Sequence, residues 1–299
     1  MIPQHYRTGL VLGALGAVLF SAKAIIVKLI YRYGVSAETV LALRMGLALP
    51  FFIAIAGWQQ RRAPLHISGR TWTHLIGVGL LGYYAASYLD FLGLQYISAA
   101  LERLILFLYP TLVLLFARVF FKRAISTRQW WALGISYLGI VLAFAHDVSL
   151  QQSGLLLGAT LVLASALAYA LYLLLGGELL QQLGTLRMTA LASCVAALAS
   201  LLQFFMMRDL AALDLPWQVY ALSGFNAVFC TVIPVFCVMF SIEIVGAGVA
   251  SQVGMLGPMS TLLLAAVLLG ETITLWHLAG TALVLLGVLM LGKAKGVKA

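Results

Sequence analysis

Long apolar segments separated by short polar stretches are the dominant pattern along the chain. A helix needs about 20 residues to cross a bilayer, and each segment is close to that length. The pattern predicts an all-α membrane protein with ten transmembrane helices, at residues 8–30, 38–57, 71–92, 98–121, 127–146, 153–176, 186–207, 217–242, 248–270 and 272–292. The connections are short, so we expect no separate soluble domain.

The ten segments divide into two halves of five, which we place at residues 1–148 and 149–299. Because five is an odd number, two halves with the same fold must lie upside down relative to each other in the membrane. Inverted repeats are typical of secondary transporters, whose substrate site lies near the midplane where the repeats meet. The sequence therefore predicts two inverted five-helix repeats around a central cavity.

Similarity between the halves supports this division. Residues 98–142 align without gaps on residues 246–290, and the alignment pairs Pro110 with Pro258 in the fourth and ninth segments. A proline removes a backbone hydrogen bond and kinks a helix, so we expect a shared bend at these two positions. The alternative is that prolines are simply more frequent in membrane helices than in soluble ones.

Composition and charge point to the same class of protein. The chain is 63% hydrophobic and 9% charged, whereas soluble domains carry about 25% charged residues. If the N-terminus is cytoplasmic, the outer loops hold only Arg32 and Arg208, and the inner side holds Arg7, Arg61, Arg62, Arg70, Arg118, Lys122, Arg123, Arg128, Arg187, Lys293, Lys295 and Lys298. This asymmetry follows the positive-inside rule. We therefore interpret the net charge of +9 as a topology signal and not as a nucleic-acid surface, and we expect both termini on the cytoplasmic side of a bacterial inner membrane.

The chain resembles the drug/metabolite transporter superfamily, specifically its ten-helix members with two EamA-type repeats. The resemblance rests on the two halves, Arg44 early in the second segment, the proline pair, and LLGETIT at 268–274 before the last helix. The first half departs from the pattern, with FKRAIS at 121–126 where the second has LGETIT at 269–274. The resemblance implies that helices one to four and six to nine surround the cavity, and that the protein exports metabolites.

We single out five charged residues within or at the ends of predicted helices, and all five belong to the first half: Lys23, Arg44, Asp90, Glu102 and Arg103. A charge at the centre of a membrane helix costs about 2.5–3.5 kcal/mol on insertion scales, so its retention indicates a function. At 1.5 Å per residue, all of them fall in the outer third of the membrane. Lys23 lies deepest and is predicted to bind a carboxylate or phosphate of the substrate.

We predict that Arg44, Asp90, Glu102 and Arg103 gate or couple transport. A low-dielectric region favours paired charges, so we expect Arg103 with Asp90, or Lys23 with Glu102, to close the outer side. Glu102 is the titratable carboxylate that a proton-coupled mechanism needs. The alternatives are a purely structural pairing, or side chains that extend to the membrane interface.

Neutral side chains are predicted to complete the substrate site: Tyr84, Tyr88, Tyr109, Tyr169, Asn226 and Gln252. Such tyrosines suit an amphipathic or aromatic metabolite, although ordinary packing of tyrosines is the alternative. Glu271 and His277 lie at the start of the last helix, where the helix dipole stabilises an acid.

These observations predict a secondary transporter that exports small metabolites, such as amino acids, by alternating access. The second hypothesis is an exchanger of nucleotide sugars or phosphorylated sugars, and a third, from another class, is a non-transporting membrane scaffold. An enzyme is not expected, because no catalytic or metal-ligand spacing and no ATP motif is present. We expect no cofactor; the expected partners are the lipid bilayer, a small-molecule substrate, and protons or a counter-solute. The oligomeric state stays open.

Overall fold

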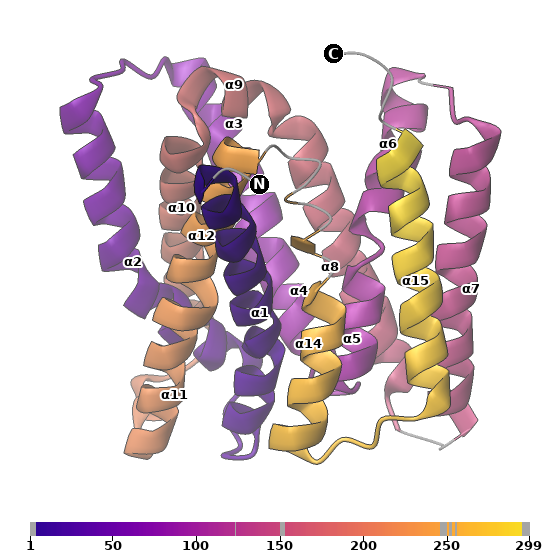
Figure 1. Ribbon diagram of the computed structural model, residues 1–299. Coiled ribbons are helices and arrows are strands. Elements are labelled where there is room, and N and C mark those ends of the chain that lie inside the picture. Colours follow the sequence, from indigo (N-terminus) through magenta and orange to yellow (C-terminus); the bar gives the residue numbers. More distant parts are fainter. Residues whose placement is uncertain are drawn as a thin grey trace.

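The computed structural model describes residues 4–122, 124–149, 153–245, 250, 253–254 and 256–294, and within these all regular structure is helical (Figure 1). Seven of the described helical segments are long and apolar enough to cross a membrane: His5–Tyr31, Ala37–Arg62, Gly69–Gly93, Ala99–Phe120, Leu155–Leu175, Thr185–Met207 and Trp217–Val245. Two shorter apolar helices follow, Leu256–Leu269 and Leu275–Met290. The all-helical membrane architecture is confirmed, and the total of ten crossings stays a prediction.

In the described part of the first half, three helices are unbroken and two are divided. The unbroken helices are α1 (Gln4–Tyr31), α2 (Ala37–Arg62) and α7 (Thr127–Ser149). The divided ones are α3 (Gly69–Gly79) with the π-helical η1 (Leu80–Ala85) and α4 (Ala86–Gly93), and α5 (Ala99–Leu106) with α6 (Tyr109–Phe121).

The described part of the second half also contains unbroken and divided helices. It contains α8 (Leu155–Leu175), the short α9 (Gly177–Leu183), α10 (Thr185–Met207), the 3-10 turn η2 (Leu210–Leu213) and α15 (Leu275–Ala294). Its divided helices are α11 (Trp217–Ala227), η3 (Val228–Val232) and α12 (Ile233–Val245), and then α14 (Leu256–Leu264) with η4 (Ala265–Leu269). Both η3 and η4 are π-helical.

Local sequence explains where the helices begin. Ser36, Ser68 and Ser98 precede α2, α3 and α5, and each accepts a hydrogen bond from a backbone N–H in the first turn, as N-cap serines do. Pro110 lies in the first turn of α6, directly after the interruption that separates α5 from α6. A proline fits this position because its missing N–H needs no partner there. The interruption between α5 and α6 lies directly before Pro110, whereas the shared bend expected at Pro110 and at Pro258, a buried residue of α14, stays a prediction.

Helices of the two halves interleave. The first-half helix α1 packs against α12 and α14 of the second half, while α8 of the second half packs against α4, α5 and α6 of the first. The pair α2 and α10 joins the halves, and α7 packs along α15. Figure 1 shows α7 and α15 together at one side of the molecule, beside the remaining helices.

The π-helical segments η1 and η3 occupy matching places. They begin at Leu80 and Val228, 148 residues apart, which is the offset that aligns residues 98–142 on residues 246–290. A π-helical turn frees backbone carbonyls from their usual partners and is often found at functional sites. Side chains of small polar residues satisfy two carbonyls here: the Ser165 hydroxyl donates to Ala86 at 2.6 Å, and the Thr231 hydroxyl donates to Asn226 at 2.9 Å.

The pairing of α7 with α15 depends on glycines at the contact. A Cβ atom placed on Gly280 would lie 2.6 Å from the carbonyl oxygen of Gly139 and 3.1 Å from the Cβ of Ala143. The two backbones therefore touch, as small residues permit in membrane helices.

Gly280→Ala is expected to lower the free energy of unfolding by about 1–3 kcal/mol, because the added methyl group forces the two backbones apart. The thermal unfolding temperature of the purified protein in detergent measures this loss. Gly134→Ala on α7 is the matched control, because nothing lies within 4 Å of a Cβ atom at that position. Equal effects of the two substitutions would contradict the close approach.

Candidate functional site

The charges predicted inside the membrane meet where α1, α2, α4 and α5 come together. The Lys23 Nζ atom lies 2.6 Å from the Asp90 Oδ2 atom, and the Asp90 side chain is only 2% exposed. The Lys23 Nζ and Arg44 Cζ atoms lie 5.8 Å and 5.2 Å from the centre of the Phe91 ring. Both cations are within the range of a cation–π interaction. Phe91 therefore contacts the cations of both α1 and α2.

Glu102 and Arg103 bring α5 into this group. Glu102 is fully buried, and neither of its carboxylate oxygens makes a hydrogen bond. The Arg103 Nε atom lies 4.0 Å from the Glu102 carboxylate, but it donates to the Thr261 hydroxyl at 3.1 Å, and the Arg103 Nη2 atom donates to the Phe20 carbonyl at 3.0 Å. Arg103 thus links α5 to both α14 and α1. We call Lys23, Asp90, Glu102 and Arg103 the charged cluster.

The ion pairs in this cluster differ from the predicted ones. The sequence suggested Arg103 with Asp90 or Lys23 with Glu102, whereas Lys23 pairs with Asp90 and Arg103 lies beside Glu102. Neighbouring residues of a helix do not face the same direction. Because Arg103 turns toward α14, it leaves Asp90 to the lysine of α1.

Arg44 is buried and does not extend to the interface. Its side chain is held in the bundle by a 2.8 Å hydrogen bond from the Arg44 Nε atom to the Thr231 hydroxyl. Only 6% of the residue is exposed. Since Thr231 lies in η3, this bond connects α2 of the first half to the π-helical segment of the second.

The predicted aromatic residues form two separate groups. The rings of Tyr84 and Tyr88 are stacked, with centres 6.3 Å apart and planes 3° apart, and both pack against the core that contains Phe91. Tyr109 and Tyr169 belong to another group, with ring centres 5.3 Å apart. That group continues through Tyr172, which lies 5.6 Å from Tyr169 and 5.2 Å from Tyr83. Tyr84 and Tyr88 therefore accompany the charged cluster, whereas Tyr109 and Tyr169 fill the contact between α6 and α8.

Of the two amide side chains predicted for the substrate site, only Asn226 lies within the described residues. Asn226 is fully buried at the end of α11, and neither its amide nitrogen nor its amide oxygen has a hydrogen-bond partner. Its backbone carbonyl accepts from Thr231, which places the residue next to the partner of Arg44. Gln252 lies outside the described residues. In the described part of the chain, no three His, Cys, Asp or Glu residues are arranged to hold a metal ion.

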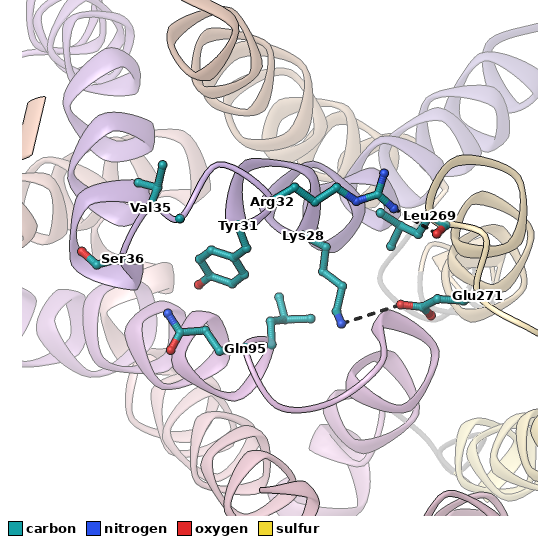
Figure 2. Close-up of a pocket in the computed structure, with 10 residues that line it drawn as sticks. Lys28, Tyr31, Arg32, Val35, Ser36, Gln95, Leu269 and Glu271 are labelled. Atoms are coloured by element: carbon teal, nitrogen blue, oxygen red, sulfur yellow. Dashed lines mark hydrogen bonds and ion pairs between the residues drawn. The ribbon is translucent and has the colours of Figure 1, made fainter. Parts of the chain in front are cut away.

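A pocket of about 630 Å³ lies at the end of the molecule where α1 finishes, and we call this end the Glu271 end. Polar and charged residues line much of the pocket: Lys28, Tyr31, Arg32, Ser36, Gln95 and Glu271. Figure 2 shows the side chains of Lys28 and Glu271 pointing toward each other. The Lys28 Nζ and Glu271 Oε1 atoms are 3.8 Å apart.

Glu271 fastens the second half to the first. Its carboxylate accepts hydrogen bonds from the backbone N–H groups of Ala99 at 3.0 Å and Ala100 at 3.5 Å, at the start of α5. We expected Glu271 to be stabilised at the N-terminus of the last helix, and this was wrong. The chain turns at Gly270, which has a φ of +72°, and Glu271 lies at the start of α5 instead. The Arg32 Nη2 atom donates to the Leu269 carbonyl at 3.0 Å. We call these contacts of residues 269–271 the Glu271 latch.

Contacts that the sequence analysis did not predict join α2 to α10 at both ends. At the Glu271 end, the Glu38 carboxylate accepts from Arg208 at 3.1 Å and from the Tyr88 hydroxyl at 3.0 Å. At the opposite end, Arg187 donates to the carbonyl of Gln59 at 3.2 Å and also to that of Ala63. Glu38 could have been noticed in the sequence, because it is an acidic residue in the first turn of a helix, where the helix dipole stabilises a negative charge.

The profile of the EamA-like transporter family matches the chain twice, at residues 7–145 and 156–293. The chain belongs to the EamA-like transporter family. Its two EamA repeats cover both halves, and the family resemblance predicted from the sequence is confirmed. Family members are transporters, so nothing indicates that this EamA protein is an enzyme.

Curated relatives of this EamA protein are also named as transporters. It is 31% identical over 286 residues to "Uncharacterized transporter YcbK" of Bacillus subtilis (strain 168), which covers 93% of this chain and 90% of that protein. It is 28% identical over 220 residues to an "Uncharacterized transporter" of Archaeoglobus fulgidus, with 73% and 77% covered. A solved protein described only as "Crystal structure of protein" has a TM-score of 0.64 at 15% identity and covers 95% of this chain and 96% of that one. This last likeness shows a shared fold.

Proposed function

We propose that this EamA protein is a secondary transporter that exports small carboxylate-bearing metabolites, such as amino acids, across the bacterial inner membrane. The buried ion pair between Lys23 and Asp90 is the observation that carries the proposal. A structural pair gains little from being placed in a membrane interior, whereas a substrate carboxylate can replace Asp90 on Lys23 without leaving the lysine uncompensated. Lys23 is therefore the proposed anchor of the substrate.

The surroundings of Lys23 suit an amphipathic molecule. The Phe91 ring lies against both Lys23 and Arg44, and the stacked rings of Tyr84 and Tyr88 pack against the same core. These rings offer contact area to the body of the substrate, while the lysine holds its charged group. Tyr109, Tyr169, Asn226 and Gln252 complete the proposed set of substrate-binding residues.

We further propose that the chain crosses the membrane ten times as two inverted repeats, residues 1–148 and 149–299. The exchange of contacts supports this arrangement, since α1 packs on the second half as α8 packs on the first. The matching positions of η1 and η3 support it independently. With both termini in the cytoplasm, the Glu271 end is the outer end.

Alternating access then requires each end to open in turn. At the outer end, the Glu271 latch and the bond between Glu38 and Arg208 hold the two halves together. At the inner end, Arg187 holds α10 to α2. We propose that Arg44, Asp90, Glu102 and Arg103 transmit substrate binding to these contacts, because they join α1, α2, α4 and α5 to η3 and α14.

One observation favours the second hypothesis, an exchanger of nucleotide sugars or phosphorylated sugars. Lys28 and Arg32 both line the pocket at the Glu271 end, and two cations suit a phosphate better than a carboxylate. Both are, however, already engaged by Glu271 and by the Leu269 carbonyl. The carboxylate proposal therefore remains the better supported one.

Reconstituted full-length protein tests the proposal. Proteoliposomes are loaded with unlabelled amino acids and exposed to a labelled mixture of the same amino acids, and a parallel set uses nucleotide sugars. We expect saturable counterflow of the amino acids, at least about 10-fold above liposomes without protein. Counterflow restricted to nucleotide sugars would favour the exchanger, and no movement of either set by folded protein would support a scaffold.

A further inference from the structure

Arg44 is a buried cation without a carboxylate of its own. Only 6% of the residue is exposed, and none of the ion pairs in the described part of the chain includes it. Its Nε atom donates to the neutral Thr231 hydroxyl, whereas its Nη1 atom makes no hydrogen bond. A buried polar atom normally has a partner, and an unpaired charge is costly in a low-dielectric region. The Arg44 guanidinium therefore calls for an anion.

The carboxylates of the described ion pairs already have one cation each. The four pairs are Lys23 with Asp90, Lys28 with Glu271, Arg103 with Glu102, and Arg208 with Glu38. The groups that act on Arg44 are Asp90 of α4 and the Cys230 thiol of η3. The neighbouring helices α10 and α11 add no anion, because Arg187 is their only charged residue. Asp90 is thus one carboxylate for two cations, with Lys23 in contact and Arg44 farther away.

Asn226 is a second unpartnered group, linked to Arg44 through one hydroxyl. The Asn226 carbonyl accepts from the Thr231 hydroxyl, which in turn accepts from Arg44. The residue is fully buried, and its side-chain nitrogen and oxygen make no hydrogen bond. Arg44 and Asn226 therefore bring unused N–H donors from α2 and α11 to the same part of the molecule.

One small molecule can reach both Lys23 and Arg44. The Lys23 Nζ and Arg44 Cζ atoms lie 5.8 Å and 5.2 Å from the centre of the Phe91 ring, so their separation does not exceed the sum of these distances. A charged N–H group binds a carboxylate oxygen at about 2.7–2.9 Å. Two carboxylates joined by a short carbon chain therefore span the remaining gap.

We propose that the substrate site selects acidic amino acids, which carry a second carboxylate on the side chain. The α-carboxylate binds Lys23, and the side-chain carboxylate binds the Arg44 guanidinium. The ammonium group binds Asp90, which the α-carboxylate has displaced from Lys23 and whose Oδ1 atom makes no hydrogen bond. This inference rests on the proposed function, because there Lys23 is the anchor of the substrate.

The charges of the substrate and the site then match group by group. Lys23 and Arg44 meet two carboxylates, and Asp90 meets the ammonium group, while Glu102 and Arg103 keep each other. A neutral amino acid leaves Arg44 without an anion, and a basic one adds a further cation. Arg44 is therefore the residue that sets the specificity for charge.

Glutamate and glutamine test the inference, because they have nearly the same shape and differ by one side-chain charge. Counterflow of each, far below saturation, is measured in proteoliposomes with the full-length protein. We expect the wild type to prefer glutamate by at least about 10-fold, and Arg44→Gln to lose about 30-fold or more for glutamate alone. Arg61→Gln is the matched control, since it changes an exposed arginine in the last turn of α2, and it should leave both rates unchanged.

The unfolding temperature in detergent is a second measurement, because a ligand that binds only the folded protein raises it. Glutamate should raise this temperature for the wild type and not for Arg44→Gln. If Arg44→Gln does not fold, Arg44→Lys serves in its place. Lysine cannot form the two parallel bonds of a guanidinium, so Arg44→Lys should weaken glutamate counterflow more than glutamine counterflow.

Equal counterflow of glutamate and glutamine by the wild type would overturn the inference and leave the proposed function standing. A glutamate preference that persists unchanged in the Arg44 variants would do the same. A glutamate-specific rise in unfolding temperature that depends on Arg44, without counterflow of any amino acid, would reject the proposed function and keep the binding site. Folded protein that neither binds nor moves an amino acid would overturn both.

Discussion

Lys23→Ala is expected to reduce amino-acid counterflow by about 100-fold, which corresponds to about 3 kcal/mol of lost binding to the charged group of the substrate. The Lys23 ammonium group is the cation paired with Asp90 at 2.6 Å in the charged cluster. Arg103 cannot replace it, because its side chain is bonded to Thr261 and to the Phe20 carbonyl. Counterflow into proteoliposomes at equal protein content measures the loss.

A structural role for Lys23 predicts a different pattern. Removing one partner of a buried ion pair is destabilising by about 3–5 kcal/mol, because it leaves the other charge uncompensated. The double variant Lys23→Ala/Asp90→Ala removes both charges and should unfold at a higher temperature than Lys23→Ala. If the lysine only stabilises the fold, the double variant should also recover transport. Recovery of stability without recovery of transport is the result that we expect.

Glu271→Ala is expected to open the outer end of the protein. The substitution removes the hydrogen bonds to the N–H groups of Ala99 and Ala100, and it leaves Lys28 without its partner. Hydrogen bonds to a charged group contribute about 1.5–3 kcal/mol each, so the population of the open state should rise by about 10-fold or more.

A cysteine at Val35 reports this opening. Val35 lines the pocket at the Glu271 end and is 6% exposed, so a thiol there should react with a membrane-impermeant reagent only when that end opens. The native Cys194, Cys230 and Cys237 are first replaced by alanine. We expect Glu271→Ala to speed labelling of Val35→Cys by about 10-fold, whereas Glu243→Ala, which alters an exposed acid of α12, should leave the rate unchanged. Equal rates in the two variants would contradict the latch.

Several features of the site followed from the sequence. Depth along each apolar segment placed the membrane charges at one level, and Lys23, Asp90, Glu102 and Arg103 do come together. This was possible because the rise of a helix is constant, so a residue's distance from the helix end gives its depth. Tyr84 and Tyr88 were both predicted for the substrate site, and their rings stack because residues four apart share one face of a helix.

The pairing of charges was not predictable in the same way. Lys23 binds Asp90 and not Glu102, and Glu271 binds the start of α5 and not its own helix. Each of these contacts joins residues that are far apart in the sequence. It depends on how each helix is rotated about its axis, and the hydrophobic pattern leaves that rotation open in helices that are apolar on all sides.

The sequence by itself determined the all-helical membrane fold and the family, and it placed Lys23, Asp90, Glu102 and Arg103 at a common level, because hydrophobic length and helix geometry are local properties. Only the tertiary structure decided the ion pairs, the Glu271 latch, the separation of Tyr84 and Tyr88 from Tyr109 and Tyr169, and the π-helical segments η1 and η3. These features arise from packing between helices of the two halves, where a side chain bonds whichever partner the rotation and approach of the helices bring within reach.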